Sequence, residues 1–224
     1  MTEPLTLEPT RRPLTAGEQR LLRVRIRTLT AAGRDASRRA FIITGSIVVV
    51  LWILTLLASD APWPVVTGFW LAMYGAIGLW ARRDMRRDGR QMLEAAGRLE
   101  SALRRNTAEA YDIRASSFAE FEEVEDEGAC YAFQIGDERL VFVAGQEFYP
   151  GARFPSLDFS LAYVLDEDGQ TVDLVIDKRG SNAAAARRIP AAAKLRLELP
   201  EHLEVRHGRL DELERVLGDP SVRT

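Results

Sequence analysis

The residues best suited to covalent or acid–base chemistry are few in this sequence. It has one cysteine, Cys130, and two histidines, His202 and His207. A thiol nucleophile needs a base and an oxyanion hole, and these two imidazoles are the histidine candidates for the base. Because Cys130 stands between Ala129 and Tyr131 in a strand-like segment, a buried structural thiol is the favoured interpretation. A membrane-bound hydrolase that uses Cys130 stays an alternative.

Carboxylates are more numerous, and two clusters could do chemistry. Six acids crowd into residues 120–127, where a solvated strand end competes with docking onto a basic partner or onto the chain's own arginine-rich helices. Asp166, Asp168 and Gly169 are residue types found in calcium loops. An EF-hand, however, would place an acid where Val164 stands and a closing glutamate that is absent. We therefore predict a turn at 166–169, with Gly169 at positive φ.

Known catalytic and cofactor motifs are missing from the chain. A single cysteine excludes a disulfide framework and a multi-cysteine metal site. The sequence contains no G-x-S-x-G, P-loop, G-x-G-x-x-G or H-E-x-x-H pattern. We predict a non-enzymatic protein without cofactor or metal.

The longest irregular stretch, residues 145–158, is the candidate docking site for a protein partner. Rigid aromatic side chains on a structured loop are good anchors for a partner. The alternative is that these aromatics cap one end of a sheet core. The candidate partner-binding residues are Phe148, Tyr149, Arg153 and Phe154.

The elements around these residues form a β-rich domain over residues 108–218, followed by a tail at 219–224. Alternation from Tyr111 to Phe121 predicts a first strand, and 129–135 with 139–144 predicts a hairpin around Gly136–Asp137. Residues 159–165 and 171–177 predict a second hairpin. A short helix at 191–197, a strand at 202–206 and a terminal helix at 210–217 complete a curled antiparallel sheet or small barrel.

Two uncharged apolar runs, residues 40–59 and 61–81, precede this domain and are 20 and 21 residues long. At about 1.5 Å per residue each run spans roughly 30 Å, the thickness of a bilayer's hydrocarbon core. We predict a transmembrane hairpin over residues 36–81, with spans at about 40–59 and 63–80. Small residues every fourth position of the second span favour helix packing within the hairpin or a homodimer: Gly68, Ala72 and Ala76.

Arginine flanks both runs but is absent from the loop between them, which places both termini in the cytoplasm. Lysine occurs only at positions 178 and 194 among 30 basic residues, which suggests a GC-rich bacterial genome and hence the bacterial inner membrane. The predicted partner of these arginines is the anionic headgroup layer, and no nucleic-acid partner is predicted. The membrane-surface residues are Arg20, Arg23, Arg27, Arg38, Arg39, Arg82, Arg83, Arg86 and Arg87.

The segments next to the spans are predicted as helices. Residues 1–14 are predicted to be a disordered arm, and Thr15 with Glu18 forms a capping box that opens a basic amphipathic helix over 15–33. We interpret that helix as lying on the membrane surface. Residues 82–107 form a helical stalk. We expect its coiled-coil seam to pack against the 16–32 helix of the same chain, with a second copy as the alternative. The seam residues are Met85, Gly89, Met92, Ala96, Leu99 and Leu103.

Together these patterns predict an α+β protein, with a two-helix transmembrane hairpin, a helical stalk and a small cytoplasmic β-rich domain. Residues 1–100 carry a net charge of +6 and residues 101–224 carry −9, so the acidic part is expected to project away from an anionic leaflet. The predicted function is a membrane-anchored binding, scaffold or regulatory module. An accessory subunit of a membrane protein complex is the other alternative.

Overall fold

The computed structural model describes residues 5–58, 62–151 and 154–218, with the backbone alone for residues 5, 6, 35–44, 81, 82 and 86. The chain divides into two compact units. The helical unit is Leu14–Asn106 with Asp166–Gln170, and the β unit contains Met1–Pro13, Thr107–Leu165 and Thr171–Thr224. The predicted α+β class is confirmed.

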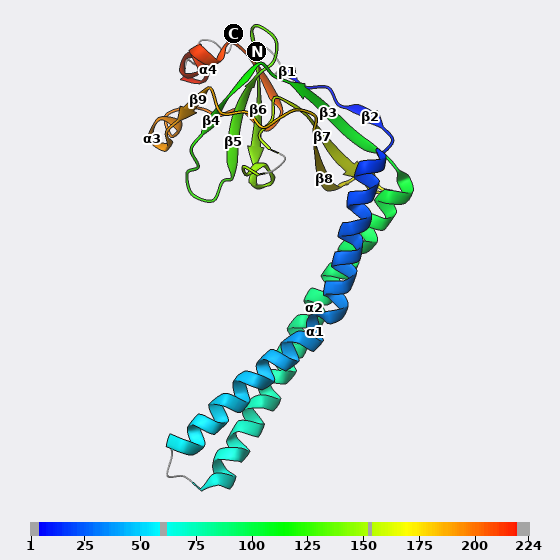
Figure 1. The fold of residues 1–224 in the computed structure, drawn as a ribbon, viewed down its shortest axis with the longest axis vertical. Helices are drawn as coiled ribbons and strands as arrows, with labels where there is room; N and C mark the ends of the chain where they lie inside the picture. The colour runs from blue at the N-terminus through cyan, green and yellow to red at the C-terminus, as the bar shows by residue number, and fades with distance from the viewer. Residues whose placement is uncertain (1–4, 59–61, 152–153, 219–224) are drawn as a thin grey trace. The chain divides into compact units, whose positions relative to one another are not determined.

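The helical unit is built on two long antiparallel helices, α1 (Ala16–Ala58) and α2 (Trp63–Arg105), which run side by side (Figure 1). The predicted capping box opens α1. The hydroxyl of Thr15 accepts the Glu18 N–H at 3.3 Å, and the Glu18 carboxylate accepts the Thr15 N–H at 2.7 Å. Asn106 caps α2 in the left-handed conformation, and its side-chain oxygen accepts a hydrogen bond from Gln19 at 3.0 Å.

The apolar stripe of the first part of α1 packs against the stalk part of α2. Leu22 is fully buried, and Ile26 and Leu29 are partly buried. The other long helix in their unit is α2, which runs beside α1. On α2, Ala96 and Leu99 of the seam are buried in the same way. The interpretation of 15–33 as a membrane-surface helix is therefore wrong, because α2 already covers the apolar face that a membrane would need. Within one chain, α1 fills the seam.

One helix in the described part of the chain, Trp63–Arg105, is long and apolar enough to cross a membrane. The apolar part of α1 that the structure describes in full, Gly45–Ala58, is shorter than a span. Position 59 and the side chains of 40–44 lie outside the described residues. The described residues thus hold one candidate span where the sequence predicted two.

The β unit contains two sheets, and among the described residues neither closes into a barrel. The larger has the strand order β1-β10-β6-β5-β4-β9, and the smaller has β2-β3-β7-β8. Both predicted hairpins are confirmed: β5 (Ala129–Gln134) pairs with β6 (Arg139–Gly145), and β7 (Asp158–Leu165) pairs with β8 (Thr171–Lys178). The pairing of β4 with β9 (Arg187–Ile189) is parallel, so the expectation of one curled antiparallel sheet is wrong.

The single strand predicted over 111–121 is two strands in different sheets, β3 (Ala108–Arg114) and β4 (Ser117–Phe121). Ile113 and Phe118 both point into the core between the sheets. They are an odd number of residues apart, so one continuous alternation cannot place both there. The chain crosses between the sheets at Ala115, whose N–H binds the carbonyl of Leu157 at 2.7 Å.

The arm predicted to be disordered contains two short strands. β1 (Leu5–Thr6) joins the larger sheet beside β10 (Glu204–His207), and β2 (Thr10–Arg12) joins the smaller one beside β3. An ion pair of 2.8 Å between Arg11 and Glu109 accompanies the second pairing. The prediction is wrong for residues 5–12, because strands of two and three residues are too short to show a period. Residues 1–4 lie outside the described part.

Two cores lie on the two faces of the larger sheet, and successive β5 residues alternate between them. Tyr131 and Phe133 point to the core between the sheets, while Cys130 and Ala132 point to the core on the other face. That second face is covered by the C-terminal segment, where Leu213 is fully buried. The covering elements are short: α3 (Ala191–Lys194), η2 (Leu210–Glu212) and α4 (Leu213–Gly218).

Candidate functional site

The 145–158 segment, predicted as a docking loop, sends two of its aromatic rings into the core. It contains the short helix η1 (Gln146–Phe148), and Phe148 and Phe154 are each only 2% exposed. The ring centroid of Phe154 lies 5.1 Å from that of Tyr131 and 5.5 Å from that of Phe148. These rings cap the inter-sheet core, which was the alternative interpretation, so they are not anchors for a partner.

The other two predicted docking residues differ from each other. Tyr149 is 45% exposed, and its hydroxyl donates a short hydrogen bond to the carboxylate of Glu123. That contact raises the pKa of Tyr149. Arg153 lies outside the described residues. Tyr149 is therefore the one described member of the predicted site that a partner could reach, and it is already tied to the acidic segment.

The acidic segment 120–127 is used inside the β unit. Glu120 pairs with Arg188 at 3.1 Å, and Glu122 accepts the N–H of Ala191 at the start of α3 at 3.0 Å. The carboxylate of Glu127 accepts the N–H of Val124 at 2.9 Å. The prediction of a solvated strand end missed the contacts with Arg188 and Ala191, because these partners are distant in sequence.

Cys130 sits near an ion pair whose lysine is buried and whose carboxylate, on Glu127, is 43% exposed. Its side chain is 5% exposed, and burial raises its pKa to about 11. Lys194 on α3, itself 4% exposed, forms an ion pair with Glu127, and its hydrogen bond lowers the pKa of that carboxyl. A buried thiol that stays protonated at neutral pH is a poor nucleophile, so this geometry favours the structural role.

His202, the other candidate for chemistry, completes a sheet edge. Its Nδ1 accepts the N–H of Ala144 at 3.1 Å, so the imidazole takes the place of a backbone carbonyl beside β6. Its Nε2 contacts the hydroxyl of Tyr163, and its ring stacks on Phe148 with centroids 5.2 Å apart. Burial lowers its pKa. Cys130 faces the opposite side of the sheet, so the two do not form a nucleophile–base pair.

The turn at 166–170 is held by the end of α2. The Asp166 carboxylate accepts the N–H groups of Asp168 at 3.1 Å and of Gln170 at 2.9 Å, and Gly169 has the predicted positive φ of 83°. The Arg105 guanidinium donates to the carbonyls of Asp166, at 2.5 Å, and of Glu167. The described residues contain no group of acids, histidines or cysteines that could hold a metal.

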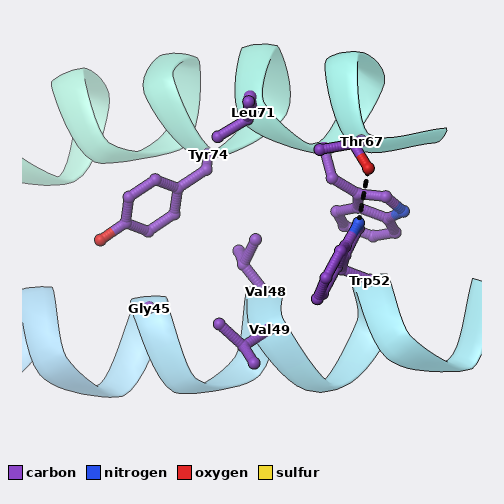
Figure 2. A pocket seen from close by; sticks show the side chains of 8 residues that line it. Gly45, Val48, Val49, Trp52, Thr67, Leu71 and Tyr74 are labelled. Atoms are coloured by element: carbon purple, nitrogen blue, oxygen red, sulfur yellow. Dashed lines mark hydrogen bonds between the residues drawn. The ribbon is translucent and has the colours of Figure 1, made fainter. Parts of the chain in front are cut away.

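An apolar groove of about 460 Å³ lies between the two long helices, and Figure 2 shows its side chains. Val48, Val49 and Trp52 of α1 face Leu71 and Tyr74 of α2. The Trp52 indole N–H donates to the hydroxyl of Thr67 at 3.3 Å, and the ring of Tyr74 lies against Gly45. Trp52 with Thr67 and Gly45 with Tyr74 make the described contacts between the apolar parts of the helices, whereas Val49 and Leu71 line the groove but stay 52% and 66% exposed.

The small-residue stripe that was predicted to make that contact lies elsewhere. Gly68, Ala72 and Ala76 are all exposed, and a Cβ added at Gly68 would meet no atom within 4 Å. The described contacts between the apolar parts of the helices come from larger side chains instead, so the prediction of packing within the hairpin is wrong for this stripe. The stripe faces outward, where a second copy or another helix could reach it.

The predicted membrane-surface arginines lie on exposed helix faces where their side chains are described: Arg20, Arg23, Arg27, Arg83 and Arg87. The side chains of Arg38, Arg39, Arg82 and Arg86 lie outside the described residues. Arg83, Arg87 and Arg90 line a hollow of about 910 Å³ on α2 together with Leu79 and Trp80. The sequence prediction did not include Arg90, although its spacing from Arg83 and Arg87 places all three on one face.

Comparison with known proteins found no match: no family model, no curated protein and no solved structure is similar to this chain.

Proposed function

We propose that this protein is an integral membrane protein. Its helical unit crosses the bacterial inner membrane twice, with both termini in the cytoplasm, and the β unit is a non-enzymatic binding, scaffold or regulatory domain at the cytoplasmic face. The proposal rests on the apolar surface of the helical unit.

That surface is the observation that carries the proposal. Large apolar side chains point outward from both helices between residues 47 and 80, and only 6% of the most apolar window of α2 is buried. A core helix of a soluble protein would be mostly buried. The described part of the β unit exposes only two large apolar side chains, Tyr149 and Leu195. The most exposed side chains of the apolar surface are Leu57, Trp63, Val65, Leu71, Leu79 and Trp80.

The length of the apolar surface fits a bilayer. Trp63 and Trp80 are exposed near the two ends of the apolar part of α2, and at about 1.5 Å per residue they are roughly 26 Å apart along the helix. Tryptophan is enriched at membrane interfaces, and the hydrocarbon core is about 30 Å thick. Arginines begin directly beyond Trp80, which supports the cytoplasmic orientation of that end.

Membrane fractionation tests the proposal. The wild-type chain should stay with the membrane pellet in high salt and at alkaline pH, and detergent should release it. Val50→Arg/Leu71→Arg should shift the chain out of the pellet, because both positions are exposed near the middle of a span, where an arginine costs about 2.5–3.5 kcal/mol on insertion scales. Leu195→Arg is the matched control in the β unit and should not. Release of the wild-type chain by salt alone would refute membrane integration.

Labelling with a membrane-impermeant maleimide tests the orientation. In a Cys130→Ala background, Pro62→Cys should react from the periplasmic side, and Asp137→Cys should react only after the membrane is opened. The reverse pattern would refute the orientation.

An accessory subunit of a membrane complex is a second candidate function. The outward stripe of Gly68, Ala72 and Ala76 favours it, because small residues let another membrane helix approach closely. Purification in mild detergent tests it: a partner retained by the wild type and lost in Ala72→Leu would support the subunit role. A partner that Ala72→Leu retains would oppose contact through the stripe.

A further inference from the structure

The hollow on α2 combines an apolar end with a cationic end. Leu79 and Trp80 are 73% and 69% exposed, and Arg83 follows within one helical turn. The hollow therefore begins on the apolar surface and continues into the arginine-rich part of the same helix. Its lining residues are Leu79, Trp80, Arg83, Asp84, Arg87, Arg90, Gln91 and Glu94.

The cationic end is a row of three guanidinium groups. Arg83, Arg87 and Arg90 are four and three residues apart, so they stand on one face, with about 5–6 Å between neighbours. None of them takes part in an ion pair among the residues that the structure describes, and all three are exposed. Guanidinium groups bind phosphate oxygens in a bidentate manner.

Two carboxylates line the same hollow at different places. Asp84 stands next to Arg83, and Glu94 lies one turn beyond Arg90 at the end away from Trp80. The described lining therefore has a net charge of +1, and Arg83 is its first charged residue beyond the apolar end. A ligand that meets this pattern has an anionic phosphate directly attached to an apolar part.

We propose that this hollow binds an anionic phospholipid, with the headgroup phosphate on Arg83, Arg87 and Arg90 and the glycerol and upper acyl chain against Leu79 and Trp80. The inference rests on the proposed membrane integration. A soluble phosphate compound would use the arginines but leave the apolar end empty, so the order of charge and hydrophobicity along α2 favours the lipid.

Lipid retention measured by native mass spectrometry tests the site. The full chain in a mild detergent is titrated with phosphatidylglycerol, and the fraction that carries one bound lipid is recorded. Arg83→Gln/Arg87→Gln/Arg90→Gln should weaken binding roughly 100-fold, since each arginine near an anionic surface contributes about a factor of five. The matched control, Arg20→Gln/Arg23→Gln/Arg27→Gln, removes the same charge from α1 and should change binding less than about threefold.

Each other outcome overturns a defined part of the inference. Equal losses in the two triple variants would mean general charge attraction without a site. Equal retention of phosphatidylcholine, or displacement of the lipid by millimolar glycerol phosphate, would exclude an anionic lipid as the specific occupant. If the wild type integrates into phosphatidylcholine vesicles but shows no preference for phosphatidylglycerol, only the lipid site fails. If it does not integrate at all, the proposed function itself fails.

Discussion

The backbones of α1 and α2 approach each other closely at Gly33 and Gly89, and replacing Gly89 by alanine tests how the helical unit is held together. A Cβ on Gly89 would lie 2.9 Å from the carbonyl oxygen of Gly33, and a Cβ on Gly33 would lie 3.0 Å from the carbonyl oxygen of Gly89. The obstructing atoms belong to the backbone and cannot rotate away. The helices would therefore have to move apart.

Two opposing terms set the size of the effect. Alanine in a helix interior is about 1 kcal/mol more favourable than glycine. Inserting a methyl group into a closely packed contact costs about 1–3 kcal/mol. We expect Gly89→Ala to lower the free energy of unfolding by about 1 kcal/mol on balance.

Gly97 supplies the matched control on the same helix. It is exposed, and a Cβ there would meet nothing within 4 Å, so Gly97→Ala gains the helix term without the clash. We expect it to raise the free energy of unfolding by about 1 kcal/mol. The two variants should therefore differ by about 2 kcal/mol, or roughly 4–8 °C in Tm for a chain of this size.

Thermal unfolding in detergent, followed by far-ultraviolet circular dichroism, measures this difference. Gly33→Ala should behave like Gly89→Ala, because it meets the same crossing from the other helix. If Gly89→Ala and Gly97→Ala were stabilised equally, the close crossing of the helices would be wrong.

Three further predictions concern the β unit. Since burial lowers the pKa of His202, the stabilisation from its neutral form is complete above the ordinary value of about 6.5 and is lost as pH falls through the lower folded value. The wild type should therefore lose more stability between pH of about 7 and about 5 than His202→Asn does. Asparagine keeps an acceptor for the Ala144 N–H but does not titrate. Equal pH profiles of the two proteins in denaturant unfolding would contradict this prediction. Cys130, buried and with a pKa raised to about 11, should react with a maleimide at neutral pH only when the β unit unfolds, and rapid labelling of the native protein would disagree. Phe154→Ala should lower the free energy of unfolding in urea by about 3–5 kcal/mol, because it leaves a cavity in the inter-sheet core. Tyr149→Ala should lower it much less, since Tyr149 is 45% exposed. Similar losses for the two variants would argue against their different burial.

Local patterns in the sequence were enough for the elements that stabilise themselves through near neighbours. The alternation of 129–144 and 159–177 around Gly136 and Gly169 predicted both β hairpins, because the turn brings the two strands together. Thr15 and Glu18 predicted the start of α1, since a capping box involves only residues three apart. The apolar runs predicted long helices in the same way.

Candidate sites were harder to predict, because composition does not tell which side of a residue is covered. Phe148 and Phe154 looked like anchors on a loop, but strands of both sheets supply the core that buries them. Gly68 looked like a packing residue, yet the helix pair meets through Trp52, Thr67 and Tyr74. Arg90, which completes the cationic row of the hollow, could have been found from its spacing to Arg83 and Arg87.

The sequence by itself determined the local patterns of this protein: which segments are helical, which alternate as strands do, where the charged residues end and where the turns lie. The tertiary structure decided which segments of the chain contact one another. It placed residues 5–12 in two sheets, split 108–121 between those sheets, and turned the acids of 120–127 toward Arg188 and Lys194. The physical reason is that a period arises from contacts a few residues apart, whereas burial of a face depends on residues from any part of the chain.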